Sequence, residues 1–217
     1  MKTDREIQEQ VLAALEWEPG VHAAHIGVSV SNGVATLHGF VTSLREKHLA
    51  ERITRRVYSV RAVANDIEVA PAGPFKRSDP AIAEAAANAL EWDSAIPDDG
   101  IKATVRKGWV TLNGTVGWQY QKAAAERAVR NLNGIEGISN AIVVEPAVNV
   151  ADVKADIEEA FKRSAEVDAQ DVHVEAHDGT VVLTGKVHSL IERDAAERAA
   201  WAAPGVRSVE DRLVVAP

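Results

Sequence analysis

The sequence predicts an α+β protein built from three tandem α-β-β-α-β units, each a small three-stranded mixed sheet with two helices on one face. The first observation is a nine-residue pattern, Gly-x-Ala/Val-Thr/Val-Leu-x-Gly-x-Val, which begins at Gly33, Gly108 and Gly179. The second is its spacing, 108 − 33 = 75 and 179 − 108 = 71, which defines a unit of about 70 residues with room for a modest core. We therefore expect three domains, at residues 1–71, 72–146 and 147–217.

Each unit opens with a helix in which apolar residues recur every four positions. These residues are Ile7, Val11 and Leu15, then Ile82, Ala86 and Leu90, then Val153, Ile157 and Phe161. A spacing of four places them on one helix face, which we expect to cover the core. Thr3-Asp4 and Ser78-Asp79 stand where an N-cap is expected, and Pro80 suits the first turn of a helix.

The repeated pattern itself is the second strand of a predicted β-hairpin. An alternating apolar run precedes each copy and leads to the turn pairs Asn32-Gly33, Lys107-Gly108 and Asp178-Gly179. Such pairs favour a type I′ turn, in which both central residues need positive φ. The turn fixes a register in which Val30 faces Ala35, Val28 faces Leu37, Val105 faces Val110 and Ala176 faces Val181. Gly39, Gly114 and Gly185 are expected to leave room for a close approach at the strand end.

A second helix and a last strand complete each unit. The helix carries an Ala-Glu-Arg triplet, beginning at Ala50, Ala125 and Ala196, and we expect its apolar face in the first unit to be Leu49, Ile53 and Val57. Because this helix joins the second strand to the third, those two strands should run parallel with a right-handed crossover. The recurring Asn65, Asn140 and Asp211 of the last strand are expected to bond turn backbone.

Composition excludes several classes of function. Thirty-two acidic residues against 24 basic ones give a net charge of −8, and an acidic chain is a poor candidate for nucleic-acid binding. The chain has no cysteine, which rules out disulfides and thiolate-metal sites. Its start enters a helical pattern at once, with no secretory segment and no long apolar run. We therefore expect a soluble, cytoplasmic protein.

No residue pattern points to catalysis, a cofactor or a metal. Nucleophile, base and orienting residue do not occur in a suggestive arrangement. The seven histidines do not recur between units, and His173 and His177 stand roughly 13 Å apart by strand rise, too far to share one metal ion. The repeated glycines lie in hairpin turns and not at helix starts, so they are no phosphate-binding loop.

The hairpin pattern, the Ala-Glu-Arg helix and the ending Gly134-Ile135-Glu136-Gly137-Ile138-Ser139-Asn140 together resemble the BON domain. The third unit keeps that ending from Gly205 to Asp211, and the first has Ser59 at the glycine position. The resemblance implies non-enzymatic modules associated with phospholipid binding, envelope maintenance and stress responses, and in one cytoplasmic relative with potassium binding. We therefore expect a binding module for an anionic phospholipid surface or a protein partner, with potassium binding as the alternative.

Two features that differ between the units are candidate contact sites. The second helix of unit one carries a basic stripe, Arg45, His48, Arg52, Arg55 and Arg56, which could equally be a solvated helix face. Unit two holds the aromatic residues Trp92, Trp109, Trp118 and Tyr120 together with the cations Lys102, Arg106 and Lys107. This combination suits a headgroup interface, although packing between units would also explain the aromatics. If the protein touches membranes, we expect the hairpin tip with Arg106, Lys107 and Trp109 to lead.

Overall fold

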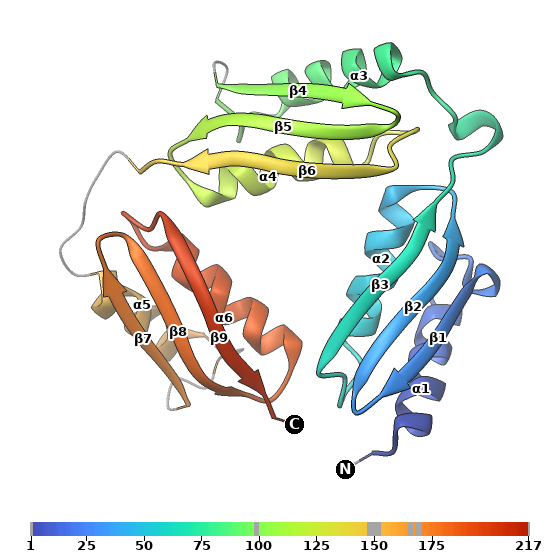
Figure 1. Ribbon diagram of the computed structural model, residues 1–217. Coiled ribbons are helices and arrows are strands. Elements are labelled where there is room, and N and C mark those ends of the chain that lie inside the picture. The colour runs from blue at the N-terminus through green and yellow to red at the C-terminus, as the bar shows by residue number, and fades with distance from the viewer. Residues whose placement is uncertain (1, 98–99, 147–152, 165–166, 168–170, 217) are drawn as a thin grey trace. The chain divides into compact units, whose positions relative to one another are not determined.

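The computed structural model describes residues 2–97, 100–146, 153–164, 167 and 171–216, and contains the α-β-β-α-β unit three times (Figure 1). The α-helices are α1 (Asp4–Glu16), α2 (Leu44–Arg55), α3 (Asp79–Trp92), α4 (Gln119–Arg130), α5 (Val153–Arg163) and α6 (Leu190–Ala202). The strands are β1 (Ile26–Ser31), β2 (Val34–Val41), β3 (Ala62–Val69), β4 (Ile101–Arg106), β5 (Trp109–Val116), β6 (Gly137–Val144), β7 (Val172–His177), β8 (Thr180–Val187) and β9 (Ser208–Val215).

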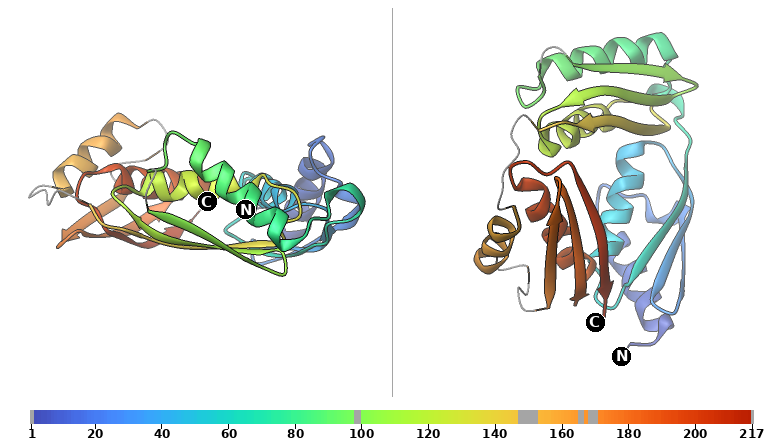
Figure 2. Two further views of the ribbon diagram at one scale, coloured as in Figure 1. Left: turned by 90° about the horizontal axis from the view of Figure 1, so that it is seen from above. Right: turned by 60° about the vertical axis from the view of Figure 1, so that its left-hand side comes forward.

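Each repeat forms its own three-stranded sheet, as predicted. The second strand of the hairpin lies in the centre, giving the orders β1-β2-β3, β4-β5-β6 and β7-β8-β9. Strand β2 pairs antiparallel with β1 and parallel with β3, and β8 pairs in the same way with β7 and β9. Within each repeat both helices lie on the same face of the sheet, which leaves the other face uncovered by them (Figure 2).

The hairpin turns and their register are confirmed. Both central residues have positive φ in every turn: 51° and 75° at Asn32-Gly33, 52° and 74° at Lys107-Gly108, and 49° and 79° at Asp178-Gly179. Val30 pairs with Ala35, Val28 with Leu37, Val105 with Val110 and Ala176 with Val181. Local turn chemistry therefore fixes which hairpin side chains share a face of the sheet.

An aspartate at the start of the first helix holds the hairpin turn in two repeats. The Asp4 carboxylate accepts hydrogen bonds from the backbone N–H groups of Asn32 and Gly33, at 2.8 and 2.9 Å. Asp79 does the same for Lys107 and Gly108, at 2.7 and 2.9 Å. These bonds, first from Gly108 and then from Lys107, hold the pKa of Asp79 below its ordinary value. The turn is thereby tied to the helix that packs beneath its hairpin.

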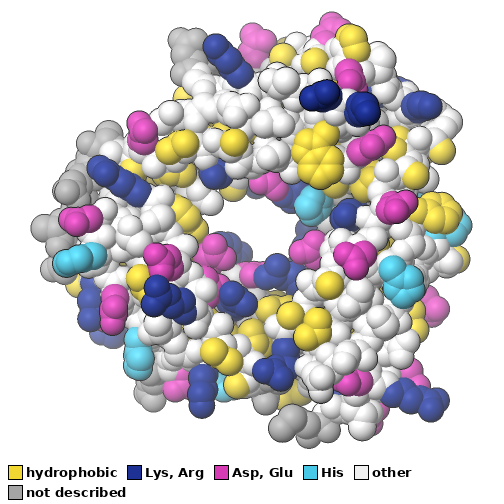
Figure 3. All heavy atoms as spheres, viewed as in Figure 1, with side chains coloured by type: hydrophobic (Ala, Val, Ile, Leu, Met, Phe, Trp, Pro, Cys, Tyr) yellow, Lys and Arg dark blue, Asp and Glu magenta, His cyan; other side chains and the backbone are white. Residues whose placement is uncertain are grey.

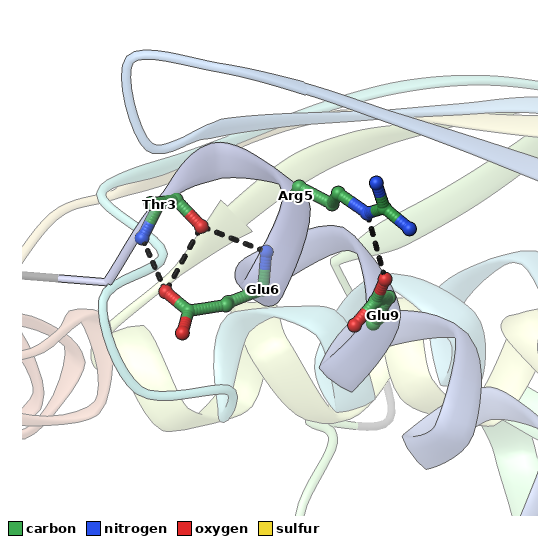
Figure 4. Close-up of polar contacts among 4 residues, drawn as sticks. All are labelled: Thr3, Arg5, Glu6 and Glu9. Atoms are coloured by element: carbon green, nitrogen blue, oxygen red, sulfur yellow. Dashed lines mark hydrogen bonds and ion pairs between the residues drawn. The ribbon is translucent and has the colours of Figure 1, made fainter.

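The start of α1 is a capping box. The Glu6 backbone N–H donates to Thr3 Oγ1 at 3.3 Å, and the Glu6 carboxylate accepts the Thr3 backbone N–H at 2.7 Å (Figure 4). An i,i+4 ion pair between Arg5 and Glu9 follows one turn later. Ser78 holds the N-cap position of α3 but makes no side-chain capping bond.

The glycine at the end of each central strand allows a close backbone approach, as predicted. A Cβ on Gly39 would lie 2.1 Å from the His25 carbonyl oxygen, and one on Gly185 would lie 2.0 Å from that of Asp171. Gly114 is tighter still, at 1.7 Å from the Gly100 carbonyl. A side chain at these positions would force the chain entering the first strand away from the sheet.

The prediction for the buried face of the second helix was wrong in part. Leu49, Ile53 and Val57 are only half-buried, whereas the fully buried positions of α2 include Ala50 and Thr54. The counterparts of Ala50, which are Ala125 and Ala196, are also fully buried. Small side chains at the contact let a helix backbone approach the sheet closely, and larger apolar residues then lie along its flank. A search for large apolar residues therefore misplaces this face.

The prediction for the polar residue of the last strand was wrong in part. Its side chain does accept a local backbone N–H, but that N–H belongs to its own strand and not to a turn, and its other bonds go to the second helix. The Asn140 amide donates to the Lys122 carbonyl and to Glu126 Oε2, both at 3.1 Å, and accepts the Ile142 N–H at 3.3 Å. Asn65 makes the same three kinds of bond in the first repeat. We call this arrangement the strand–helix clamp.

The third repeat keeps the clamp with different chemistry. Asp211 cannot donate from its carboxylate, and the donor there is Arg193, whose Nε lies 2.6 Å from Asp211 Oδ2. Arg193 occupies the position of Lys122 in the second repeat. The Leu213 N–H still donates to Asp211, at 2.9 Å. An amide in the second repeat and an ion pair in the third therefore make the same connection between the last strand and the second helix.

Candidate functional site

The predicted hairpin tip brings Arg106, Lys107 and Trp109 together at the turn between β4 and β5. Arg106 and Trp109 face each other across the strand pair. The Trp109 side chain is 52% exposed and its indole lies over Gly137 on β6, where an added Cβ would fall 2.3 Å from a ring carbon. One face of the indole is thus held against backbone. The other repeats have Val34 beside Ala62 and Thr180 beside Ser208 at the equivalent places.

Two carboxylates accompany the two cations of this tip. Asp79 bonds the turn N–H groups of Lys107 and Gly108, and its lowered pKa keeps it ionised near neutral pH. The Glu136 side chain passes beside the turn, with its Cγ 3.0 Å from where a Cβ on Gly108 would lie. The formal charges of Arg106, Lys107, Asp79 and Glu136 therefore cancel. The exposed indole distinguishes this tip more than its net charge does.

The other predicted aromatics of unit two are not part of the tip. Trp118 and Tyr120 follow the far end of β5, and that end, at Val116, is roughly 23 Å from Trp109 by strand rise. Their ring centroids are 6.4 Å apart, with 33° between the ring planes, and the side chains are 41% and 58% exposed. Trp109 at the start of β5 and the pair Trp118 and Tyr120 after its end are therefore two separate aromatic positions and not one cluster.

Three arginines of the predicted basic stripe form an exposed row on α2 and its C-cap residue, Arg56. Arg45, Arg52 and Arg56 are exposed, and their spacings, 52 − 45 = 7 and 56 − 52 = 4, place them within roughly 40° of one another around the helix. The buried Ala50 and Thr54 lie on the opposite side. Among the described residues none of the three arginines makes an ion pair. We call these three residues the arginine row.

The remaining members of the predicted stripe lie beside this row. Arg55 is half-buried, with its Nη1 3.8 Å from the Glu51 carboxylate. His48 is also half-buried, and burial is the main cause of its lowered pKa, so its imidazole is neutral near pH 7. The row of free positive charge is therefore shorter than the sequence suggested. The other repeats do not preserve the arginine row. Arg45 corresponds to Tyr120 and Ile191, and Arg56 corresponds to Asn131 and Ala202.

The candidate Trp92 and a further indole, Trp17, are more exposed than the other candidate aromatics. Trp17 and Trp92 occupy the same position at the end of the first helix in repeats one and two, and are 90% and 87% exposed. Trp17 was not among the predicted contact residues. The available signal was the repeated triplet Leu-Glu-Trp, which the third repeat replaces with Phe161-Lys162-Arg163. Exposed indoles at a repeated place that the fold does not require are candidates for contact with a partner.

The rest of the surface offers little further chemistry. Basic and acidic side chains are interspersed on the face shown in Figure 3. Within the described ranges, no group of three or more His, Asp or Glu side chains could hold a metal ion. No described helix has both the length and the apolar character needed to cross a membrane.

The fold and these surfaces define a tandem array of small α+β modules with exposed cationic and aromatic side chains. The sequence profile of the BON domain matches residues 3–71, 78–146 and 149–217. The chain therefore belongs to the BON domain family, with three tandem copies.

Among curated proteins, the chain is similar to osmotically-inducible protein Y of Escherichia coli K12. The two are 34% identical over 118 residues, which cover 48% of this chain and 56% of that protein. Of solved structures, CdsD of the Chlamydia trachomatis type III secretion system matches over 98% of this chain and 93% of its own, at 17% identity and a TM-score of 0.27. The PrgH periplasmic domain matches over 95% and 100%, at 8% identity and a TM-score of 0.24.

Proposed function

We propose that this protein is a binding module that contacts anionic phospholipid surfaces as part of an osmotic stress response. The stress assignment rests on the likeness to osmotically-inducible protein Y, of which the chain spans 56%. The lipid assignment rests on one observation: three exposed arginines of α2, without carboxylate partners among the described residues, lie along one line of the helix. A row of cations along a helix matches the repeated negative charge of an anionic headgroup layer.

The expected attachment is weak and depends on salt. A basic residue near an anionic leaflet contributes about 1 kcal/mol, so the arginine row supplies about 3 kcal/mol. This attraction decays within a Debye length, about 10 Å at 0.1 M salt. The chain as a whole carries a charge of −8, which opposes approach in any other orientation. The row should therefore orient the first repeat towards the membrane as well as attract it.

The hairpin tip of the second repeat should contribute less to membrane binding than the arginine row does. Its charges cancel, so Arg106 and Lys107 add little long-range attraction. The exposed face of the Trp109 indole suits the headgroup layer, where amphipathic rings are favoured. Replacing Trp109 should weaken binding without changing its salt dependence, whereas replacing the arginines should change both.

The test is co-sedimentation with phosphatidylglycerol vesicles and, as a comparison, phosphatidylcholine vesicles. The variant Arg45→Glu, Arg52→Glu and Arg56→Glu should lose binding to phosphatidylglycerol, and the native chain should bind phosphatidylcholine much less. A matched control reverses the three cations of α5, Lys154, Lys162 and Arg163, which are also exposed. Each triple variant moves the net charge from −8 to −8 − 6 = −14. The α5 variant should keep most of the binding.

Two results would contradict the proposal. If both triple variants lose binding equally, overall charge governs the association and the arginine row is not the contact. If the native chain does not sediment with phosphatidylglycerol at low salt, lipid is not the ligand, and an acidic protein partner becomes the better explanation for the row.

A further inference from the structure

The six sheet edges of the protein differ in how they are protected against pairing with another strand. An unprotected edge exposes backbone N–H and C=O groups that can add a strand, and charged residues commonly prevent this. Four of the edge strands carry charged residues: Asp66 and Glu68 on β3, Lys102 and Arg106 on β4, Glu175 on β7, and Glu210, Asp211 and Arg212 on β9. Strand β1 has none, but the Gln8 side chain donates to its Val28 carbonyl at 2.7 Å.

Strand β6 is the exception. Its eight residues, Gly-Ile-Ser-Asn-Ala-Ile-Val-Val, include no charged residue and no proline. The positions that hold Asp66 and Glu68 in the first repeat hold Ala141 and Val143 here, and Val143 is 53% exposed. In the first repeat the Lys47 ammonium also donates to the Ile67 carbonyl of β3, at 2.7 Å. No such bond joins Lys122 to Ile142 among the described residues.

The strand–helix clamp identifies which backbone groups of β6 face the open edge. The Ile142 N–H donates to the side chain of Asn140, so it is not used by the neighbouring strand β5. Successive residues of a strand direct their backbone groups to opposite sides, so Ile138, Asn140, Ile142 and Val144 face the edge, and Ala141 faces β5. The Asn140 bond is long, at 3.3 Å, and is a weak substitute for a strand partner.

We propose that β6 pairs antiparallel with β6 of a second copy of this chain, about a two-fold axis at Ala141. This register places Ala141 opposite itself, Asn140 opposite Ile142, and Ser139 opposite Val143. Each of these pairs is uncharged, and opposed residues lie on the same face of the sheet. Because Asn140 and Ile142 direct their backbone groups to the open edge, each Asn140–Ile142 pair exchanges two backbone hydrogen bonds. A two-fold contact uses the same strand from both copies, so the association closes at the dimer and does not continue into a fibre.

The strand is better suited to a second copy than to an unrelated peptide. It has no charge with which to select a partner of opposite sign, whereas pairing with itself repeats the uncharged pairs Asn140–Ile142 and Ser139–Val143 on both sides of the axis. The equivalent edge of the first repeat would bring aspartate and glutamate to such a contact, through Asp66 and Glu68. Among the strands that the structure describes, β6 of the second repeat therefore is the one that combines an open edge with a sequence that can oppose itself without charge.

The first test measures the mass of the full chain by sedimentation equilibrium over a range of concentrations. The native chain should form a reversible dimer. Ala141→Asp places two like charges opposite each other at the axis and should give a monomer. The first repeat carries Asp66 at the same position, so the fold tolerates this residue. The matched control is Asn113→Asp, which adds the same charge on the central strand β5, away from the edge, and should leave the dimer intact.

The second test fixes the register by disulfide formation, because the chain has no cysteine of its own. Ala141→Cys should yield a cross-linked dimer under mild oxidation, since directly opposed residues of this kind have Cα atoms about 4.5 Å apart. Ser139→Cys should not, because in this register it faces Val143 and lies roughly 13 Å from its own copy. A native chain that stays monomeric at every concentration overturns the proposal. So does a dimer that survives Ala141→Asp, or one in which Ser139→Cys cross-links as readily.

Discussion

Removing the clamp amide of the second repeat, by Asn140→Ala, should destabilise that repeat by about 3 kcal/mol. Asn140 makes three hydrogen bonds, to the Lys122 carbonyl, to Glu126 and to the Ile142 N–H. A net bond between neutral groups contributes about 1 kcal/mol and one to a carboxylate about 1.5 kcal/mol or more. The long Ile142 bond is assigned about 0.5 kcal/mol, because the N···O distance is 3.3 Å.

Hydrogen exchange of individual segments is the suitable assay, since a three-repeat chain need not unfold in one step. A loss of about 3 kcal/mol raises the opening equilibrium roughly a hundredfold, so amides of α4 and β6 should exchange that much faster. Repeats one and three act as internal references and should not change. The control is Asn131→Ala, which removes an amide that also donates to a helix carbonyl, that of Arg127, but from an exposed position.

The effect should also depend on pH. Burial alone would raise the pKa of Glu126, but the hydrogen bonds from Asn140 and Arg130 outweigh it and hold this pKa below the ordinary value of 4.5. A lowered folded-state pKa stabilises the repeat above pH 4.5, and this contribution is lost as the pH falls through the folded value. The difference between native chain and Asn140→Ala should therefore shrink in acid. Unchanged exchange in α4 and β6 at neutral pH, or equal acceleration in all three repeats, would refute the reasoning.

Three further changes test other parts of the structure. Asn140→Asp should destabilise repeat two more than Asn140→Ala does at neutral pH, because it places a carboxylate near Glu126. Adding Lys122→Arg, which copies repeat three, should recover part of this loss in the same exchange assay. Asp79→Ala should speed exchange of the Lys107-Gly108 turn amides. In the native chain the protection of these amides should fall as the pH drops below 3.8, because the lowered pKa of Asp79 confers stability only while its carboxylate is ionised. Gly137→Ala should displace the Trp109 indole, whose ring would lie 2.3 Å from the new Cβ, and should shift its indole N–H resonance; an unmoved resonance would contradict the packing.

Features that depend on neighbours in sequence were predictable. The turn pairs require positive φ at both central residues, and this requirement set the hairpin register before any contact with a helix was known. Apolar spacing of four placed Ile7, Val11 and Leu15 on one face, and all three are buried. The resemblance carried by the repeated motifs gave the family. Each of these signals is local, because turn geometry and helix periodicity act over a few residues.

Features that depend on contact between distant elements were decided only by the tertiary structure. The buried face of α2 centres on small residues such as Ala50, whose burial reflects how closely the sheet approaches and not how apolar the side chain is. The seat of Trp109 requires Gly137, 28 positions away, and the partner of Asn140 is a helix 14 residues earlier. The sequence thus determined the three units, their strands and the aromatic and basic residues that differ between them. Packing between strand and helix decided which of those residues are exposed, paired or placed side by side, because such contacts leave no period in the sequence.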